Sequence, residues 1–261
     1  MSRKLRILIK KKFAYLFKLL VIFIWLFFLA TISIGSEDLP IIVIDPGHGG
    51  SEEGATGYYQ SREKQINLTL AYRIVHYLSN KCHVILTREK DTFTSLLDRT
   101  AKANHYQAIA FISLHVGASY RLVPEGISTY YWQPSQGEFF FEDISNKNYH
   151  QNGHSIPEPP LWDHLQRYHL NTSKLLAQTI HKSILSEVDI NDRKIRGAPI
   201  FVLAGADMPA ILIEFGYISH PKEEKNLLRL NYINKIAQGI AIGIEKFIEK
   251  NSFGIEKDLQ Y

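Results

Sequence analysis

Cysteine is almost absent from this sequence of 261 residues, in which Cys82 is the only one. A single thiol cannot form a disulfide within one chain, and it cannot supply the several cysteines that hold zinc in a zinc finger. A disulfide-stapled scaffold and a cysteine-ligated metal site are therefore both excluded. Any metal that one copy of the chain binds must be held by histidine and carboxylate side chains, of which the sequence has 11 and 26.

Three familiar signatures are also missing from the sequence. It contains no compact HExxH metal motif, no glycine-rich loop that would cradle a phosphate before a helix, and no internal repeat. Excess positive charge is missing from most of the chain as well. Seven of the 30 basic residues precede residue 19, and without them 23 basic residues face 26 acidic ones, a net charge of −3. Nucleic-acid binding therefore lacks an electrostatic basis.

Those seven basic residues are followed by an apolar run over residues 19–30. Basic residues followed by an apolar run are the order of a secretory signal, and this run is shorter than the ~20 residues that a membrane-spanning helix needs. Ser33 and Gly35 supply the small residues that a signal peptidase reads. We predict that residues 1–35 are a cleaved signal peptide and that the chain is exported. An uncleaved membrane anchor is the alternative.

Apolar patterns typical of strands and helices alternate between residues 41 and 249. Continuous β-branched runs predict strands, and apolar residues at three-to-four spacing predict helices. The predicted strands are residues 41–44, 83–87, 108–114, 127–132, 199–203 and 209–215. The predicted helices are residues 64–78, 95–106, 171–187 and 232–249. This alternation implies one α/β domain, residues 36–251, with a largely parallel sheet. Residues 252–261 are expected to be a frayed tail.

The alternation breaks between residues 133 and 167. This stretch is acidic, aromatic and proline-containing, with three phenylalanines at 139–141 and with Pro157, Pro159 and Pro160. A long segment without a regular pattern inside a compact domain is typical of a functional loop or an insertion. We interpret it as an insertion that lies over the surface of the domain.

Three polar side chains occur where predicted strands end. His48 and His115 each follow a strand, and Glu214 lies near the end of the last strand. In open α/β sheets, the binding crevice lies outside the carboxyl ends of the strands. A fourth polar residue, Glu63, stands at the start of a predicted helix. Two imidazoles and one carboxylate suit a catalytic zinc ion, because a fourth position then stays open for a water that the metal acidifies.

Glu63 is the candidate for the third ligand, and Glu214 is the candidate for the base that takes a proton from the attacking water. By spacing alone this evidence is weak, because the residues are far apart in the sequence. Glu63 alone is better explained as a carboxylate that the helix dipole favours at an N-terminus. Glu214 alone lies in an apolar strand, where a carboxylate is costly to bury without a partner, and this favours a functional role.

The other polar residues are expected to have structural roles. Arg88 and Arg99 are predicted to pair with Asp91 or Asp98 inside the domain rather than to bind substrate. Most of the remaining histidines are predicted to lie on the surface or to pack in the domain. None of them is needed as a metal ligand.

Four sequence blocks occur in the order in which a known family carries them. They are residues 42–50 (IVIDPGHGG), 63–68 (EKQINL), 113–115 (SLH) and 213–219 (IEFGYIS). In these blocks the chain resembles the AmiC-like catalytic domain of the zinc-dependent N-acetylmuramoyl-L-alanine amidases of bacterial cell walls. The resemblance covers about residues 41–248. It implies a single α/β domain with a mixed, mostly parallel sheet that is flanked by helices on both faces.

The resemblance also implies an enzyme that hydrolyses the amide bond between N-acetylmuramic acid and the L-alanine of the stem peptide. It implies one zinc ion bound by His48, Glu63 and His115, with Glu214 as general base and acid. Peptidoglycan is the expected partner, in the periplasm or at the outer face of the cytoplasmic membrane. Contact with a membrane is expected only through an uncleaved signal.

Two departures from the family pattern fall beside the expected site. Val116 and Gly117 stand where the family commonly has Ala-Asn, and His220 stands where it has Asn. These changes leave zinc binding intact but alter the cleft, so Gly117 and His220 are candidates for contact with substrate. Cleavage of another bond in the stem peptide stays open for this reason. A catalytically silent role as a wall-binding or division scaffold is the other alternative.

Some related amidases carry an inserted helix at the position of residues 133–167, which occludes the zinc until a partner protein releases it. By this resemblance, Glu138, Glu142 or Asp143 is a candidate to reach the open position of the metal. An activator protein would then displace the insertion. A passive surface loop is the alternative.

Overall fold

The computed structural model describes residues 11–23, 25, 39–119, 125–134 and 161–258. It divides into two units, Met1–Asp38 and Leu39–Tyr261. In the first unit, residues 11–23 are helical and their side chains are exposed. No helix in the described part of the chain is long and apolar enough to cross a membrane. The three acidic residues predicted to reach the metal, Glu138, Glu142 and Asp143, lie outside the described residues.

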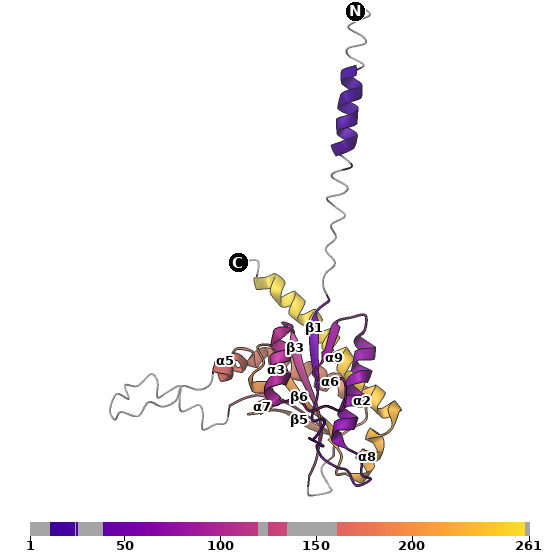
Figure 1. Cartoon of the computed structure of the whole chain (residues 1–261), viewed down its shortest axis with the longest axis vertical. Coiled ribbons are helices and arrows are strands. Elements are labelled where there is room, and N and C mark those ends of the chain that lie inside the picture. Colours follow the sequence, from indigo (N-terminus) through magenta and orange to yellow (C-terminus); the bar gives the residue numbers. More distant parts are fainter. Residues whose placement is uncertain (1–10, 24, 26–38, 120–124, 135–160, 259–261) are drawn as a thin grey trace, which may run out of the picture. The chain divides into compact units, whose positions relative to one another are not determined.

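Six strands of the second unit form one sheet, in the order β2-β1-β3-β6-β4-β5. They are β1 (Ile41–Pro46), β2 (His83–Leu86), β3 (Ala110–Gly117), β4 (Ile127–Trp132), β5 (Asp192–Ala198) and β6 (Ala210–Tyr217). β2, β1, β3 and β6 pair in parallel, whereas β4 is antiparallel to β6 and parallel to β5. The predicted mixed, mostly parallel sheet is confirmed (Figure 1).

Helices cover both faces of this sheet. They are α2 (Glu63–Leu78), α3 (Leu96–His105), α5 (Leu161–Tyr168), α6 (Leu170–Glu187), α7 (Phe201–Ala204), α8 (Pro221–Leu227) and α9 (Leu230–Asp258). α2, α6 and α9 pack together over the larger core on one face, and α3 and α7 pack over a smaller core on the other. The predicted single α/β domain with helices on both faces is confirmed (Figure 1).

Alternation along the strands sorts their side chains between the two cores. On β1, Ile44 belongs to the larger core and Val43 to the smaller one. Because successive strand residues point to opposite faces, Asp45 follows Val43 onto the side of the smaller core. On β6, Leu212 belongs to the smaller core, and Glu214 follows it onto the same face. Polar groups of neighbouring strands therefore meet on one face, beyond the end of the smaller core.

Helices α6 and α9 lie close together because two glycines of α9 face α6. A Cβ atom at Gly239 would lie 2.7 Å from the Cα of Ile184, and one at Gly243 would lie 2.5 Å from the Cα of Ile180. Both distances are too short for a side chain, so only glycine permits this approach. The close contact buries both isoleucines completely.

The prediction of a strand at residues 199–203 is wrong. The strand in this region, β5, lies earlier in the chain, and the predicted segment contains the short helix α7. β5 has the sequence DRKIRGA at the edge of the sheet, with no fully buried position, so it lacks the apolar run that predicts a buried strand. The apolar run that follows it instead buries Val202 and Leu203 in the smaller core.

Two strands extend further than predicted. β3 continues past the predicted end at residue 114, through His115 to Gly117, and β6, which is predicted to include Glu214, continues past residue 215 to Tyr217. Both candidate site residues therefore lie within strands, where pairing with a neighbour fixes the backbone on each side. This makes their positions more rigid than positions in a loop would be.

Two predicted irregular segments are partly helical. α9 continues to Asp258, past the start of the tail predicted at residue 252, and no proline after Asn251 ends the helix. In the predicted insertion, the last residues form α5. Gln166 of this helix is buried and donates hydrogen bonds to the carbonyl oxygens of Ala206 and Met208. The end of the 133–167 stretch is thus an integral part of the domain.

Candidate active site

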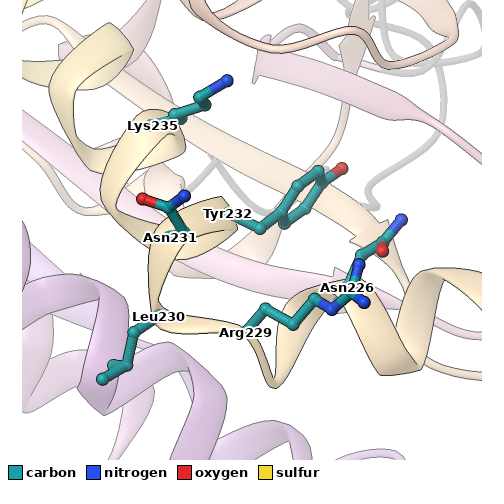
Figure 2. Close-up of a pocket in the computed structure, with 6 residues that line it drawn as sticks. All are labelled: Asn226, Arg229, Leu230, Asn231, Tyr232 and Lys235. Atoms are coloured by element: carbon teal, nitrogen blue, oxygen red, sulfur yellow. The ribbon is translucent and has the colours of Figure 1, made fainter.

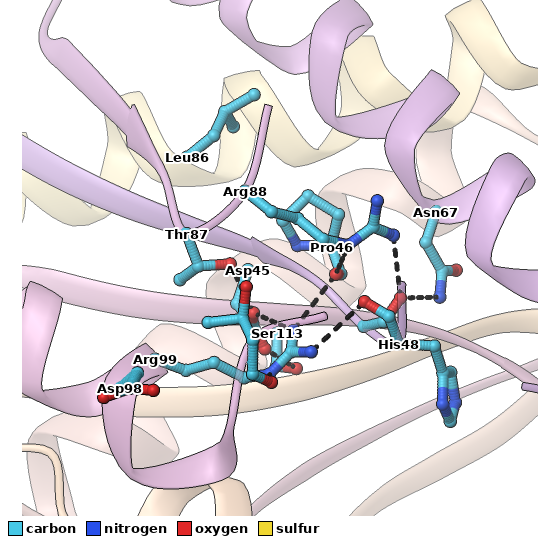
Figure 3. A network of polar contacts seen from close by, with 12 residues as sticks. Asp45, Pro46, His48, Asn67, Leu86, Thr87, Arg88, Asp98, Arg99 and Ser113 are labelled. Atoms are coloured by element: carbon cyan, nitrogen blue, oxygen red, sulfur yellow. Dashed lines mark hydrogen bonds and ion pairs between the residues drawn. The ribbon is translucent and has the colours of Figure 1, made fainter. Parts of the chain in front are cut away.

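The turn after β1 presents His48 at the carboxyl edge of the sheet (Figure 3). His48 has a φ of 61°, in the left-handed region, and Gly49 and Gly50 follow with φ of 131° and 57°. Glycine adopts such angles without strain, whereas a residue with a side chain, such as His48, adopts the left-handed region only uncommonly. Gly47 leaves room for the second imidazole, because a Cβ atom there would lie 2.4 Å from ring atoms of His115. The glycines of the first sequence block thus shape the turn around two histidines.

Two buried arginines hold this turn by its backbone (Figure 3). Arg88 donates to the carbonyl oxygen of Gly47 at 2.9 Å. Arg99 forms an ion pair with the buried Asp45, with 2.6 Å between Nη1 and Oδ1, and donates to the carbonyl oxygen of His48 at 3.1 Å. Arg99 does pair with an aspartate inside the domain, but its partner is Asp45 and not the predicted Asp91 or Asp98, whereas Arg88 binds carbonyl oxygens. Both arginines position the turn that carries His48.

The carboxylate of Glu63 lies between the two imidazoles, at the first residue of α2. Its Oε1 lies 3.0 Å from Nδ1 of His115 and accepts a hydrogen bond from the N–H of Val116 at 3.0 Å. Its Oε2 lies 3.3 Å from Nε2 of His48 and accepts from the N–H of Ala55 at 2.9 Å. Two backbone donors therefore orient this carboxylate, one for each oxygen.

His48, Glu63 and His115 form a compact group. Their ligand atoms all lie within 4.8 Å of one another, and no other metal-binding group of three occurs among the described residues. The two rings meet edge to face, with 4.9 Å between their centroids. Their side chains are 28% and 22% exposed, so one side of the group faces solvent. Two imidazoles and one carboxylate with an open side fit the ligand set of a catalytic zinc ion.

Hydrogen bonds within this group shift the pKa values of Glu63 and His48 in opposite directions, and both shifts favour the charged forms. Burial alone would raise the pKa of the Glu63 carboxyl, but hydrogen bonds with His115 and His48 outweigh burial and hold this pKa well below its usual range. The hydrogen bond to Glu63 in turn raises the pKa of His48, against the opposing effect of burial. Glu63 is therefore ionised at neutral pH, which is the form that binds a metal ion.

Glu214 lies beside this group on the adjacent strand. β3 and β6 pair in parallel, and Glu214 is the register partner of His115. Side chains of register partners point to the same face, about 5 Å apart. Glu214 is not a member of the compact group of three ligands. Its carboxylate is instead contacted by the hydroxyls of Tyr130 and Tyr217, each 3.3 Å from Oε2.

The two predicted substrate contacts both have structural roles. A Cβ atom at Gly117 would lie 2.8 Å from the ring of Tyr217, so glycine leaves space for that ring. His220 is the N-cap of α8, and its Nδ1 accepts a hydrogen bond from the N–H of Glu223 at 3.4 Å. Its Nε2 lies 3.8 Å from the carboxylate of Glu125. Contact of either residue with substrate stays a prediction.

A buried glutamate of α8 holds the loop that precedes the carboxylate of Glu63, the candidate metal ligand. Glu224 is completely buried and accepts hydrogen bonds from the N–H groups of Tyr59, at 2.9 Å, and Ser61, at 3.2 Å. The same loop contains Ala55, whose N–H binds Glu63. An element near the end of the domain thus fixes one wall of the site.

Sequence reasoning missed Tyr130, Tyr217 and Glu224 as parts of the site. Tyr217 lies in the last matching block, three residues after Glu214. The sequence therefore shows an aromatic residue close to Glu214, but it does not show that its hydroxyl points toward the Glu214 carboxylate. Tyr130 and Glu224 come from segments that no motif marks. Their roles depend on strand pairing and on a contact between distant parts of the chain.

A separate cavity of about 570 Å³ opens at the turn between α8 and α9 (Figure 2). It is lined by Asn226, Arg229, Leu230, Asn231, Tyr232 and Lys235. None of the candidate site residues lines it. The site at the strand ends is therefore defined by its side chains and not by this cavity.

Comparison with known proteins identifies the family to which the chain belongs. A family model described as N-acetylmuramoyl-L-alanine amidase matches residues 42–246, which include His48, Glu63, His115 and Glu214. The chain belongs to this amidase family. Its alternating strands and helices and its group of three ligands thus belong to an amidase domain.

Named relatives of this amidase domain come from several bacteria. AmiC of Escherichia coli O6:H1 (strain CFT073) is 27% identical over 223 residues, which cover 81% of this chain and 54% of AmiC. AmiA of Escherichia coli K12 is 32% identical over 218 residues, which cover 78% of this chain and 74% of AmiA. The chain therefore spans about half the length of AmiC.

A solved structure supports the same assignment. The catalytic domain of CwlV, an N-acetylmuramoyl-L-alanine amidase from Bacillus (Paenibacillus) polymyxa var. colistinus, matches with a TM-score of 0.65 at 30% identity. The match covers 81% of this chain and 99% of the CwlV domain. The fold described above is thus that of an amidase catalytic domain.

Proposed function

We propose that this chain is a zinc-dependent N-acetylmuramoyl-L-alanine amidase that acts on peptidoglycan. The observation that carries the proposal is the group of His48, Glu63 and His115 with Glu214 as the register partner of His115. Three ligands with an open side, next to a carboxylate outside that ligand group, are what metal-assisted amide hydrolysis requires. Membership of the amidase family supplies the substrate class.

The chemistry divides between the metal ligands and the base. When bound, a zinc ion would polarise the scissile carbonyl and supply a water of lowered pKa. His48, Glu63 and His115 would hold the ion, and two backbone N–H groups keep the Glu63 carboxylate between the rings. Glu214 takes a proton from the attacking water and returns it to the amine of L-alanine as the amide bond breaks.

Digestion of purified sacculi tests this function. We expect the wild-type chain to release intact stem peptides that begin with L-alanine, as identified by mass. A chelator should stop digestion, and added zinc should restore it. His115→Ala should lose both zinc and activity, whereas His76→Ala, an exposed histidine of α2, should keep both. Glu214→Gln should still bind one zinc ion but lower kcat by about 10²- to 10⁴-fold.

Two results of the same assay would contradict the proposal. Fragments cut within the stem peptide would identify another bond as the target. Zinc binding without any digestion would indicate a wall-binding scaffold. Products with a free lactyl group on N-acetylmuramic acid distinguish the amidase from both.

We also propose an exported location, with residues 1–35 as the signal, because the family relatives are cell-wall amidases. N-terminal sequencing of the secreted chain tests the cleavage site. A start at Ser36 supports cleavage. A start at Met1 in a membrane fraction would support the uncleaved anchor.

Autoinhibition by residues 133–167 is a further part of the proposal. Glu138, Glu142 or Asp143 would supply the carboxylate that reaches the metal, and an activator protein would remove it. Replacement of residues 135–160 by a short Gly-Ser linker leaves α5 and the contacts of Gln166 in place. Higher activity after this deletion supports autoinhibition, and unchanged activity refutes it.

A further inference from the structure

Two tyrosine hydroxyls converge on one oxygen of the candidate base. Tyr130 Oη and Tyr217 Oη each lie 3.3 Å from Oε2 of Glu214. Among the described residues, no donor meets the other oxygen, Oε1. Oε2 is thus held by two hydrogen bonds, whereas Oε1 is available to accept a proton. This asymmetry is useful in a general base, whose reactive oxygen must point in a defined direction.

The pairing of β4 with β6 places Tyr130 next to Glu214. β4 is antiparallel to β6, and Ser128 is the register partner of Glu214 while Tyr130 is the partner of Leu212. Tyr130 is therefore the diagonal neighbour of Glu214 on the same face, a distance that a long aromatic side chain spans. The antiparallel direction of β4 in an otherwise mostly parallel sheet creates this pairing.

Tyr217 is fixed from several sides. Its N–H donates to the carboxylate of the buried Glu223 at 2.6 Å. Its ring packs against the backbone at Gly117, where a Cβ atom would lie 2.8 Å away, and the guanidinium of Arg193 lies 4.9 Å from the ring centroid. A side chain held in this way loses little further freedom when its hydroxyl binds Glu214.

We propose that Tyr130 and Tyr217 are positioning residues that orient the Glu214 carboxylate for proton transfer, a role that rests on the proposed amidase function. Burial, followed by the negative charge of Glu214, raises the pKa of both hydroxyls. The tyrosines therefore stay protonated at neutral pH and remain hydrogen-bond donors. Gly117 contributes indirectly, because the absence of a side chain there leaves space for the ring of Tyr217.

The test replaces each hydroxyl by hydrogen and measures sacculus digestion. We expect Tyr130→Phe and Tyr217→Phe each to lower kcat by about 3- to 10-fold, and the double variant by about 10- to 100-fold, as the loss of one or two hydrogen bonds predicts. KM, bound zinc and Tm should stay close to wild type. Tyr131→Phe is the matched control, because it removes a hydroxyl from the opposite face of the same strand.

Two results would overturn this role. One is a double variant with wild-type kcat. The other is a loss of kcat that is matched by loss of zinc or by a rise in KM. A crystal structure of the double variant gives a readout that does not need activity. The carboxylate of Glu214 should leave its position against β4, and an unchanged carboxylate would refute positioning even if the wild-type chain digests no sacculi.

Discussion

The polar groups of the site are held mainly by main-chain atoms. Backbone N–H groups orient Glu63, and arginine side chains bind the carbonyl oxygens of the turn around His48. In the described part of the site, the Asp45–Arg99 pair behind this turn is the one ion pair that joins two buried charges. Asp45 also accepts hydrogen bonds from Thr87 and Ser113, so its carboxylate is fully enclosed by donors. Removal of the positive charge would leave a buried carboxylate without its ion pair.

Arg99→Met should therefore lower the free energy of unfolding by about 3 to 5 kcal/mol. Arg99→Lys keeps the charge but loses part of the fork of donors, so its loss should be smaller. Urea unfolding of the purified variants measures both values. Equal stability of Arg99→Met and the wild type would show that the pair adds nothing to the fold.

Glu223 makes stability depend on pH. Burial, only partly opposed by hydrogen bonds from the N–H groups of Tyr217 and Gly126, raises the pKa of this carboxyl from 4.5 to about 7. Between these values the folded chain keeps a proton that the unfolded chain has lost. The contribution of Glu223 to the free energy of unfolding thus falls as pH rises from about 4.5 to about 7.

Glu223→Gln removes this titration. Its amide keeps only one acceptor for two backbone donors, so the variant should be less stable at every pH. The readout is the difference between Tm at about pH 5 and at about pH 7.5. The wild type loses the contribution of Glu223 between these two pH values, and the variant has no such contribution to lose. On going from about pH 5 to about pH 7.5, the Tm of the variant should therefore fall less, or rise more, than the Tm of the wild type. An identical difference in both proteins would exclude Glu223 as the titrating group.

At the scale of elements, the sequence predicts what is buried. The runs over β1, β3 and β6 are almost continuously apolar, and the predicted strands match them to within a few residues. β5 escaped prediction because it is an edge strand whose residues are mostly charged or exposed. The apolar segment after it resembles a buried strand in composition, although it forms a helical turn against the smaller core.

The residues of the candidate site also fall into those that the sequence predicts and those that it does not. Glycines and histidines at strand ends mark two of the three candidate ligands in the sequence, His48 and His115. Tyr130 and Glu224 could not be predicted, because their contacts with Glu214 and Tyr59 join residues 84 and 165 positions apart. Such contacts follow from strand order and register, which local patterns do not contain.

The packing of α6 against α9 gives an element-scale prediction. Gly243→Ala should lower the free energy of unfolding by about 1 to 3 kcal/mol, because the new methyl group would overlap the backbone at Ile180. Alanine favours a helix over glycine by about 1 kcal/mol, so any loss reports packing. Gln238→Ala, at an exposed position of α9, is the control and should change stability by about 0.5 kcal/mol at most. Chemical unfolding that ranks the two variants equally would contradict this account.

At the scale of the whole molecule, zinc should couple the site to the stability of the domain. The three ligands come from the turn after β1, the start of α2 and β3, so an ion bound to all three is lost when the domain unfolds. Zinc at about 100 times its Kd should add about 2.7 kcal/mol. For a chain of this size, that corresponds to a rise in Tm of about 5 to 11 °C over the chelated form. His115→Ala should show the same Tm with zinc and with chelator, and a wild-type Tm that ignores zinc would mean that the ligands do not bind it together.

The contact of Glu224 with the Tyr59 loop has a consequence for biosynthesis. A nascent or truncated chain that stops before β6 contains all three ligands but lacks the base Glu214 and the side chain that fixes the loop beside Glu63. Under the proposed mechanism, such a fragment is inert. If the chain has the proposed amidase function, hydrolysis of the wall begins only when the C-terminal end of the domain has been synthesised and folded, and the cell is protected from incomplete translation products.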